Sequence, residues 1–171
     1  ENTYRDGDYI RSSLAGRFIL TGKRFKVSEV LELDGVDFHT GNIHYPGDVV
    51  LRGEIGDGFS IVCGGDLYAS VSLMVTDVQV KGDLTVEGGI LGRRNGVLKC
   101  GGSIRAKFIE NLTLECRSDL QADSGILQSR VYVLGKILCG EKGRIINSKV
   151  YGMAGVEAQQ LGNPAGLVTT V

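Results

Sequence analysis

The aspartates that recur along this chain occupy one position of a repeated Gly-rich turn; they are Asp48, Asp66, Asp83 and Asp119. Carboxylates stacked in a column could bind Ca²⁺, which prefers many oxygen ligands. Asp also stabilises turns by accepting hydrogen bonds from the nearby backbone. Ser103 and Lys136 interrupt the column, and the Gly-rich signature of calcium-binding β-helix repeats is absent. We therefore expect each aspartate to stabilise its own turn, with no metal site.

Three of the cysteines fall at equivalent positions of the repeat: Cys63, Cys100 and Cys116. The absence of a Cys-x-x-Cys pair argues against a structural zinc site. Cys100 and Cys116 belong to neighbouring repeats, and a spacing of about 4.8 Å between adjacent strands falls within the Cα separation of a disulfide. However, in-register parallel neighbours rarely offer the disulfide torsion, and a buried free cysteine behaves as a small hydrophobe. We expect reduced thiols in the core.

The two histidines, His39 and His44, lie just before the first full repeat. A metal site there would need a third ligand, for which Asp37 and Asp48 are the nearest candidates. A general base is the other chemistry open to them. No second catalytic group accompanies them, and no G-x-S-x-G, H-E-x-x-H or P-loop motif is present. We expect exposed loop histidines, and we predict no catalytic, cofactor-binding or metal-ligating residue.

Four side-chain amides stand three residues before the start of a repeated strand: Asn95, Asn111, Gln128 and Asn147. Stacked amides can hydrogen-bond to one another along a solenoid. The alternative is four unrelated loop residues, and both interpretations stand at this point.

A regular repeat positions these residues. Residues 61–69 read IVCGGDLYA, and related segments begin at residues 78, 98, 114, 131 and 150. The equivalent apolar residues, spaced by 16 to 20 positions, are Val49, Leu67, Leu84, Ile104, Leu120, Ile137 and Val156. A period this regular predicts a solenoid.

Each repeat alternates between apolar and polar residues on both sides of its Gly turn, as strands with one buried face do. A third short apolar segment completes a triangular coil. Helical hairpins are excluded because each Gly inside a helix would cost about 1 kcal/mol. The turn occurs once per coil, which favours a right-handed coil. We predict an all-β, right-handed parallel β-helix of about seven coils over residues 46–171.

Residues 1–45 do not follow the repeat and are predicted to form a β-rich N-terminal cap. Residues 4–11 and 17–26 alternate around Asp-Gly and Thr-Gly turns, as hairpins do. Residues 30–38 have a third strand-turn-strand pattern. We expect this segment to cover the first coil, because an open solenoid end exposes core and unpaired strand edge.

The outer faces of the predicted solenoid carry the residues expected to contact a partner: Tyr68, Tyr132, Leu138 and Tyr151. Exposed aromatic and apolar groups mark interfaces. The 19 basic and 20 acidic residues nearly cancel and form no block, which argues against nucleic acid. No apolar run approaches the roughly 18 residues that a membrane span needs. Because the chain begins at Glu1 without a methionine, we expect it to be part of a longer protein.

Several stretches of the chain resemble the flagellar assembly protein A (FapA) family of bacteria. They are Thr40-Gly41-Asn42-Ile43, Asp57-Gly58-Phe59-Ser60, Cys63-Gly64-Gly65-Asp66-Leu67, Arg105-Ala106-Lys107-Phe108-Ile109-Glu110-Asn111, Lys142-Gly143-Arg144-Ile145 and Gly162-Asn163-Pro164-Ala165-Gly166. The chain departs from the family's small-Gly-Gly turn at Arg117-Ser118, Leu134-Gly135 and Met153-Ala154. The resemblance implies a right-handed parallel β-helix within a longer cytoplasmic protein that has a further N-terminal domain and a helical C-terminal part. It also implies a role in flagellar assembly or polar localisation through protein contacts, with no catalytic residues.

Three functions are compatible with these observations. The leading hypothesis is a non-enzymatic scaffold that binds flagellar or polar regulatory proteins and requires no cofactor. The second is a polymer-forming β-helix like the bactofilins, which would self-associate end to end. The third is a β-helical carbohydrate-active enzyme or acyltransferase, which would need acidic, basic or histidine side chains gathered on one groove.

Overall fold

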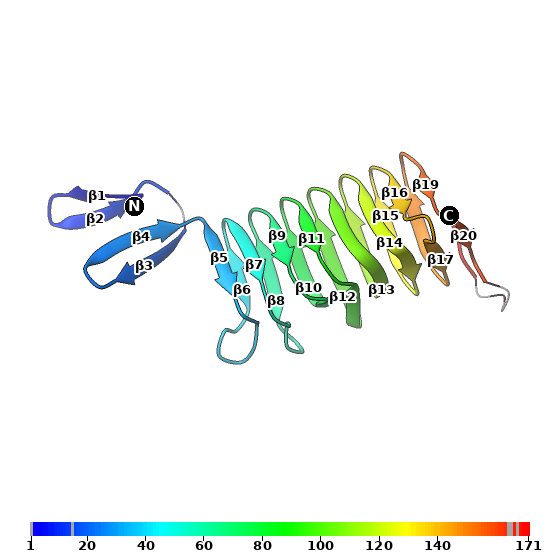
Figure 1. Ribbon diagram of the computed structural model, residues 1–171, viewed down its shortest axis with the longest axis horizontal. Helices are drawn as coiled ribbons and strands as arrows, with labels where there is room; N and C mark the ends of the chain where they lie inside the picture. Colours follow the sequence, from blue (N-terminus) through cyan, green and yellow to red (C-terminus); the bar gives the residue numbers. More distant parts are fainter. Residues whose placement is uncertain (1, 15, 164–165, 167) are drawn as a thin grey trace.

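The computed structural model describes residues 2–14, 16–163, 166 and 168–171, and within this part of the chain every regular element is a β-strand. The strands wind into a rod of stacked triangular coils, with two hairpins beyond its N-terminal end (Figure 1). The pairings within the stack are parallel, and the register shifts where β10, β12, β13 and β14 bend from one face to the next. The prediction of a parallel β-helix is therefore confirmed, and the structure agrees with the right-handed coil expected.

Three sheets, which we call faces A, B and C, make up the coil. Face A contains β5 (Val30–Leu33), β7 (Asp48–Leu51), β9 (Leu67–Ala69), β11 (Leu84–Val86), the first parts of β13 (Ile104–Cys116) and β14 (Leu120–Leu127), β16 (Ile137–Cys139) and β19 (Val156–Glu157). Face B contains the first parts of β10 (Leu73–Val80) and β12 (Ile90–Cys100), the middle of β13, the end of β14, β17 (Arg144–Ile146) and β20 (Gln160–Leu161). Face C contains β6 (Ile43–Tyr45), β8 (Ser60–Cys63), the last parts of β10, β12 and β13, β15 (Arg130–Val133) and β18 (Lys149–Gly152).

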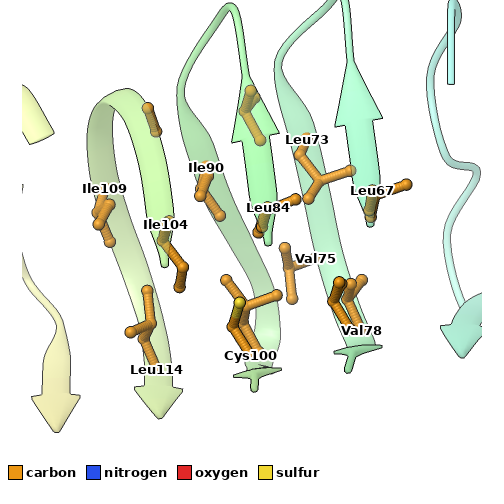
Figure 2. Close-up of a cluster of buried hydrophobic side chains, with 14 of the residues drawn as sticks. Leu67, Leu73, Val75, Val78, Leu84, Ile90, Cys100, Ile104, Ile109 and Leu114 are labelled. Carbon is orange, nitrogen blue, oxygen red and sulfur yellow. The ribbon is translucent and has the colours of Figure 1, made fainter. Parts of the chain in front are cut away.

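The core is formed by the inward residues of the three faces, which meet on the axis of the solenoid (Figure 2). Leu84 on face A, Ile90 on face B and Leu98 on face C belong to one level of it, and all three are fully buried. Burial of each such side chain stabilises the fold by about 1.5–3 kcal/mol. Because like residues stack on like residues in successive coils, the repeat in the sequence becomes a continuous apolar column.

The corner before face C is built from the amide residues Asn95, Asn111, Gln128 and Asn147. All four adopt the left-handed backbone conformation, with φ between 47° and 65°. Asn tolerates this conformation better than most residues with a side chain. In the described residues no side-chain hydrogen bond joins one amide to the next, and the Asn111 amide donates instead to the Gly92 carbonyl at 3.2 Å. The four residues therefore share one corner of the coil. That corner requires a left-handed backbone conformation and does not depend on hydrogen bonds between the side-chain amides.

The parallel stack begins earlier than the sequence indicated. The first strand predicted within residues 30–38 is present as β5, which pairs in parallel with β7. The second is reduced to Val36, which forms a parallel bridge with Ile55. Leu31 and Leu33 pack against the core from β5. Residues 30–45 thus form a coil of their own, ahead of the expected start at residue 46. The Gly turn that marks the other coils is missing before β5, which hid this coil from the repeat analysis.

The two predicted N-terminal hairpins are confirmed. They consist of β1 (Thr3–Asp6) with β2 (Tyr9–Ser12), and β3 (Arg17–Thr21) with β4 (Arg24–Ser28), both antiparallel. The Tyr45 hydroxyl joins the second hairpin to the first coil: it accepts a hydrogen bond from the Arg17 amide at 2.9 Å and donates to the Ser28 carbonyl at 2.7 Å. The hairpins lie beyond the N-terminal end of the rod and point away from it (Figure 1).

Candidate functional site

A groove of about 1060 Å³ runs along the outside of face C, and we call it the face C groove. Two outward columns of residues line it, each contributing one residue per coil. The first column lies within the strands and contains Val62, Gln79, Lys99, Glu115, Tyr132 and Tyr151. The second column lies one residue beyond the buried end of each strand and includes Lys81, Gly101, Arg117, Leu134 and Met153. The second column changes along the rod from charged to apolar, and the first column ends in two tyrosines.

The apolar end of the groove lies in the last two coils. Tyr132 on β15 and Tyr151 on β18 are register partners, and their rings stack with centroids 5.2 Å apart and planes inclined by 6°. Leu134 and Met153 lie two residues beyond them. The exposed fractions are 44% for Tyr132, 57% for Leu134, 46% for Tyr151 and 79% for Met153. Four large apolar side chains are thus exposed side by side, which is typical of an interface.

The charged end of the groove carries an excess of positive charge. Lys99 forms an ion pair with Glu115 on the neighbouring coil at 3.5 Å. Lys81 and Arg117 have no ion pair among the described residues. Gly101 separates these two cations in the second column, so the groove is open between them. Two cations are therefore available to an incoming acidic group.

The predicted contact residues divide between two faces. Tyr132 and Tyr151 meet in the face C groove, whereas Tyr68 and Leu138 lie on β9 and β16 of face A. The Tyr68 hydroxyl donates to the Glu87 carboxylate at 3.3 Å. Desolvation, followed by the nearby Glu87 charge, raises the pKa of Tyr68. The sequence analysis missed Leu134 and Met153 as contact residues, although both begin the turns that depart from the family pattern.

The turn aspartates bond to the coil that follows and not to their own turn, which corrects the prediction. The Oδ1 of Asp48 accepts the Asp66 amide at 2.8 Å, and the Oδ1 of Asp66 accepts the Asp83 amide at 2.8 Å. Asp83 and Asp119 accept the amides of Ser103 and Lys136 in the same way, each at 2.7 Å. The column is therefore a chain of hydrogen bonds between coils.

A glycine of the following coil makes room for each of these carboxylates. A Cβ at Gly65, Gly82, Gly102 or Gly135 would overlap the Oδ1 of the aspartate in the coil before it. Where the coil before carries Ser103 or Lys136 in place of aspartate, the following coil has Ser118 or Ala154 in place of glycine. Two of the family departures, at Ser118 and Ala154, thus follow from a missing aspartate one coil earlier.

The cysteines are free, and Cys63, Cys100 and Cys116 are buried, as predicted. The hydrogen bond with Cys116, together with burial, raises the pKa of Cys100. Burial likewise raises the pKa of Cys63, and it raises that of Cys139 on β16 to about 11. The raised pKa values hold the thiols of Cys63, Cys100 and Cys139 in the protonated form, which is not the nucleophilic one. The hydrogen bond with Cys100 lowers the pKa of Cys116.

The histidines lie on different elements. His39 belongs to an exposed loop in which the Asp37 carboxylate accepts the amides of His39 at 2.8 Å and Thr40 at 3.0 Å. The bonds from Thr40 and His39 lower the pKa of Asp37. His44 lies on strand β6, where we had expected a loop, and points outward. Across the described residues no group of three or more His, Cys, Asp or Glu side chains could hold a metal ion.

Comparison with protein families matches residues 29–171 to the Flagellar Assembly Protein A (FapA) β-solenoid domain. The chain belongs to the FapA family. The match begins at the residue before β5, where the parallel stack of coils begins. No curated protein and no solved structure was found to be similar to the chain. Within the described residues, no helix has the length and apolar character needed to cross a membrane. The family assignment indicates a role in flagellar assembly.

Proposed function

We propose that this FapA domain is a non-enzymatic scaffold that serves flagellar assembly by holding protein partners in its face C groove. The observation that carries the proposal is the exposed apolar cluster of Tyr132, Leu134, Tyr151 and Met153. Interfaces bury such side chains at their centre and place charged groups around them. Arg117 in the adjacent coil and Lys81 at the far end of the groove supply that charge.

The polar groups of the described residues favour binding over catalysis. The turn carboxylates accept hydrogen bonds from backbone amides, and the two histidines lie on separate elements. The thiols of Cys63, Cys100 and Cys139 have raised pKa values. A general acid or base must lie within hydrogen-bond reach of the group it serves, usually with a second group that orients it. The face C groove presents an ion pair, two cations and four apolar side chains, a set suited to recognition of a protein surface.

The proposal also places the protein in the bacterial cytoplasm, at the cell pole. A fluorescent fusion produced from the native locus would give polar foci if this is correct. Uniform fluorescence, with unchanged flagellation, would separate the scaffold role from the polar location.

The binding role is tested by changing the groove in a flagellated bacterium that carries this chain. The triple variant Tyr132→Ala, Tyr151→Ala and Met153→Ala removes exposed side chains and leaves the core intact. We expect loss of the co-purifying flagellar proteins and a reduced number of flagella. Tyr68→Ala, on face A, is the matched control and should retain both. Unchanged flagellation in the triple variant, with equal protein levels, would contradict the proposal.

A further inference from the structure

We infer that the face C groove binds an acidic amphipathic helix of the partner protein, lying along the axis of the rod. The inference rests on the proposed binding function and specifies the chemistry of the partner. Three features carry it: the order of apolar and charged residues, the length of the groove, and the state of the backbone in its floor.

The order of residues fixes the chemistry of the two ends of the ligand. Tyr151 and Met153 would receive apolar side chains, since both remain exposed although Tyr132 stacks on one face of the Tyr151 ring. Lys81 and Arg117, which have no ion pair among the described residues, would receive carboxylates. In the part of the chain that the structure describes, no aspartate of the turn column forms an ion pair with either cation.

The length of the groove fixes the length of the ligand. Four coil steps separate Lys81 from Met153, by way of Gly101, Arg117 and Leu134. At about 4.8 Å per step the two ends are about 19 Å apart. A helix rises about 1.5 Å per residue, so about 13 residues would span this distance.

Among the described strands, the middle of the groove floor has no free edge to which a strand could be added. β12 pairs with β10 and β13, and β13 pairs with β12 and β15, so the strands in the middle of face C are paired on both sides. Only side chains point into the groove from this floor. An occupant must therefore satisfy its own backbone groups, which a helix does and an extended peptide does not.

The test uses the 171-residue chain and fluorescein-labelled peptides of about 14 residues, with leucines at i, i+3, i+4 and i+7. One peptide carries glutamates toward one end, a second carries lysines in their place, and a third is the acidic peptide with a central proline that breaks the helix. Fluorescence anisotropy gives the affinities, and circular dichroism reports helix formation on binding.

We expect the acidic helical peptide to bind at least about tenfold more tightly than either of the other two peptides, and to gain helicity. Tyr151→Ala should weaken its binding by about tenfold, as the loss of a central aromatic anchor does. The double variant Lys81→Glu and Arg117→Glu should reverse the preference toward the lysine peptide. Tyr68→Ala should change nothing.

Equal binding of the acidic and lysine peptides, or of the acidic and proline peptides, would overturn the inference. So would full affinity in Tyr151→Ala. If the peptides fail in this way while the triple variant still loses its partners and flagella in cells, the scaffold proposal stands and the helical ligand is wrong. If the triple variant is also unaffected in cells, both are wrong.

Discussion

The pairing of each turn aspartate with a glycine one coil later predicts a strong coupling between Asp48 and Gly65. A Cβ at Gly65 would overlap the Asp48 Oδ1, whereas the next nearest atoms, Gly47 C and Asp48 N, lie 3.0 and 3.1 Å from it. Gly65→Ala must therefore displace the carboxylate and break its 2.8 Å bond from the Asp66 amide. A hydrogen bond to a charged group contributes about 1.5–3 kcal/mol. We expect Gly65→Ala to lower the free energy of unfolding by about 2 kcal/mol. This figure covers the loss of a partly exposed hydrogen bond and the strain of displacing the Asp48 carboxylate.

Asp48→Ser removes the same hydrogen bond from the other side, and we expect a loss of about 1.5 kcal/mol. It also removes the Oδ1 that an alanine Cβ at Gly65 would overlap, and leaves the backbone contacts with Gly47 C and Asp48 N. The double variant should therefore lose about 1.5 kcal/mol, well short of the sum of the single losses, with a coupling of at least about 1 kcal/mol. Urea unfolding followed by circular dichroism measures these free energies, and hydrogen exchange of the Asp66 amide reports the bond itself.

The chain supplies a reciprocal control at Ser103 and Ser118, where the aspartate and the glycine are both absent. Ser103→Asp should destabilise the solenoid because its carboxylate meets the Cβ of Ser118, and Ser118→Gly should restore stability in the double variant. Additive losses in both pairs would refute the coupling of carboxylate and glycine across coils.

Three further predictions follow from the same structure. Alkylation of Cys139 by iodoacetamide, followed by mass spectrometry, should be slow at pH 8 and rise with pH toward about 11, because its pKa is raised to that value. Because the Cys139 thiol ionises more readily in the unfolded chain, its contribution to the free energy of unfolding should be fully present below about pH 8.5. That contribution should be lost as the pH rises from about 9 to 11, and a free energy of unfolding that does not fall over this range would contradict the raised pKa. Millimolar Ca²⁺ or EDTA should leave the melting temperature unchanged, because the turn carboxylates already accept backbone amides; a clear rise with Ca²⁺ would show a cation site. Sedimentation of the purified chain should show monomers or dimers and no filaments, because the hairpins joined through Tyr45 lie beyond the N-terminal end of the stack.

The fold could be predicted from the sequence because each coil repeats the same inward residues. Leu67, Leu84 and Ile104 stand about one coil apart in sequence and stack in the core. The coil that begins at Val30 escaped detection because only its apolar alternation survives, without the Gly turn. Hydrogen bonds from one coil to the next, such as that from the Asp66 amide to Asp48, join residues 18 positions apart. The repeat brings such residues together, but it does not show which backbone amide donates a hydrogen bond to a given carboxylate.

The candidate site could be predicted only in part. The alternation of apolar and polar residues predicts that Tyr132 and Tyr151 point outward. Because they occupy the same position in successive repeats, it also predicts that they are neighbours. The structure divides the four predicted contact residues between two faces, with Tyr68 and Leu138 on face A. In the sequence, Leu134 and Met153 stand out only because they depart from the turn pattern of the family. The structure places them in the second outward column, beside the stacked tyrosines.

The central claim is that the face C groove is the surface that holds partners in flagellar assembly. Its most direct test is a photo-crosslinking amino acid introduced at Tyr151 on face C or at Tyr68 on face A, in cells that are building flagella. We predict a crosslinked flagellar assembly protein from position 151 and none from position 68. Capture of the same protein from both positions, or only from position 68, would contradict the claim.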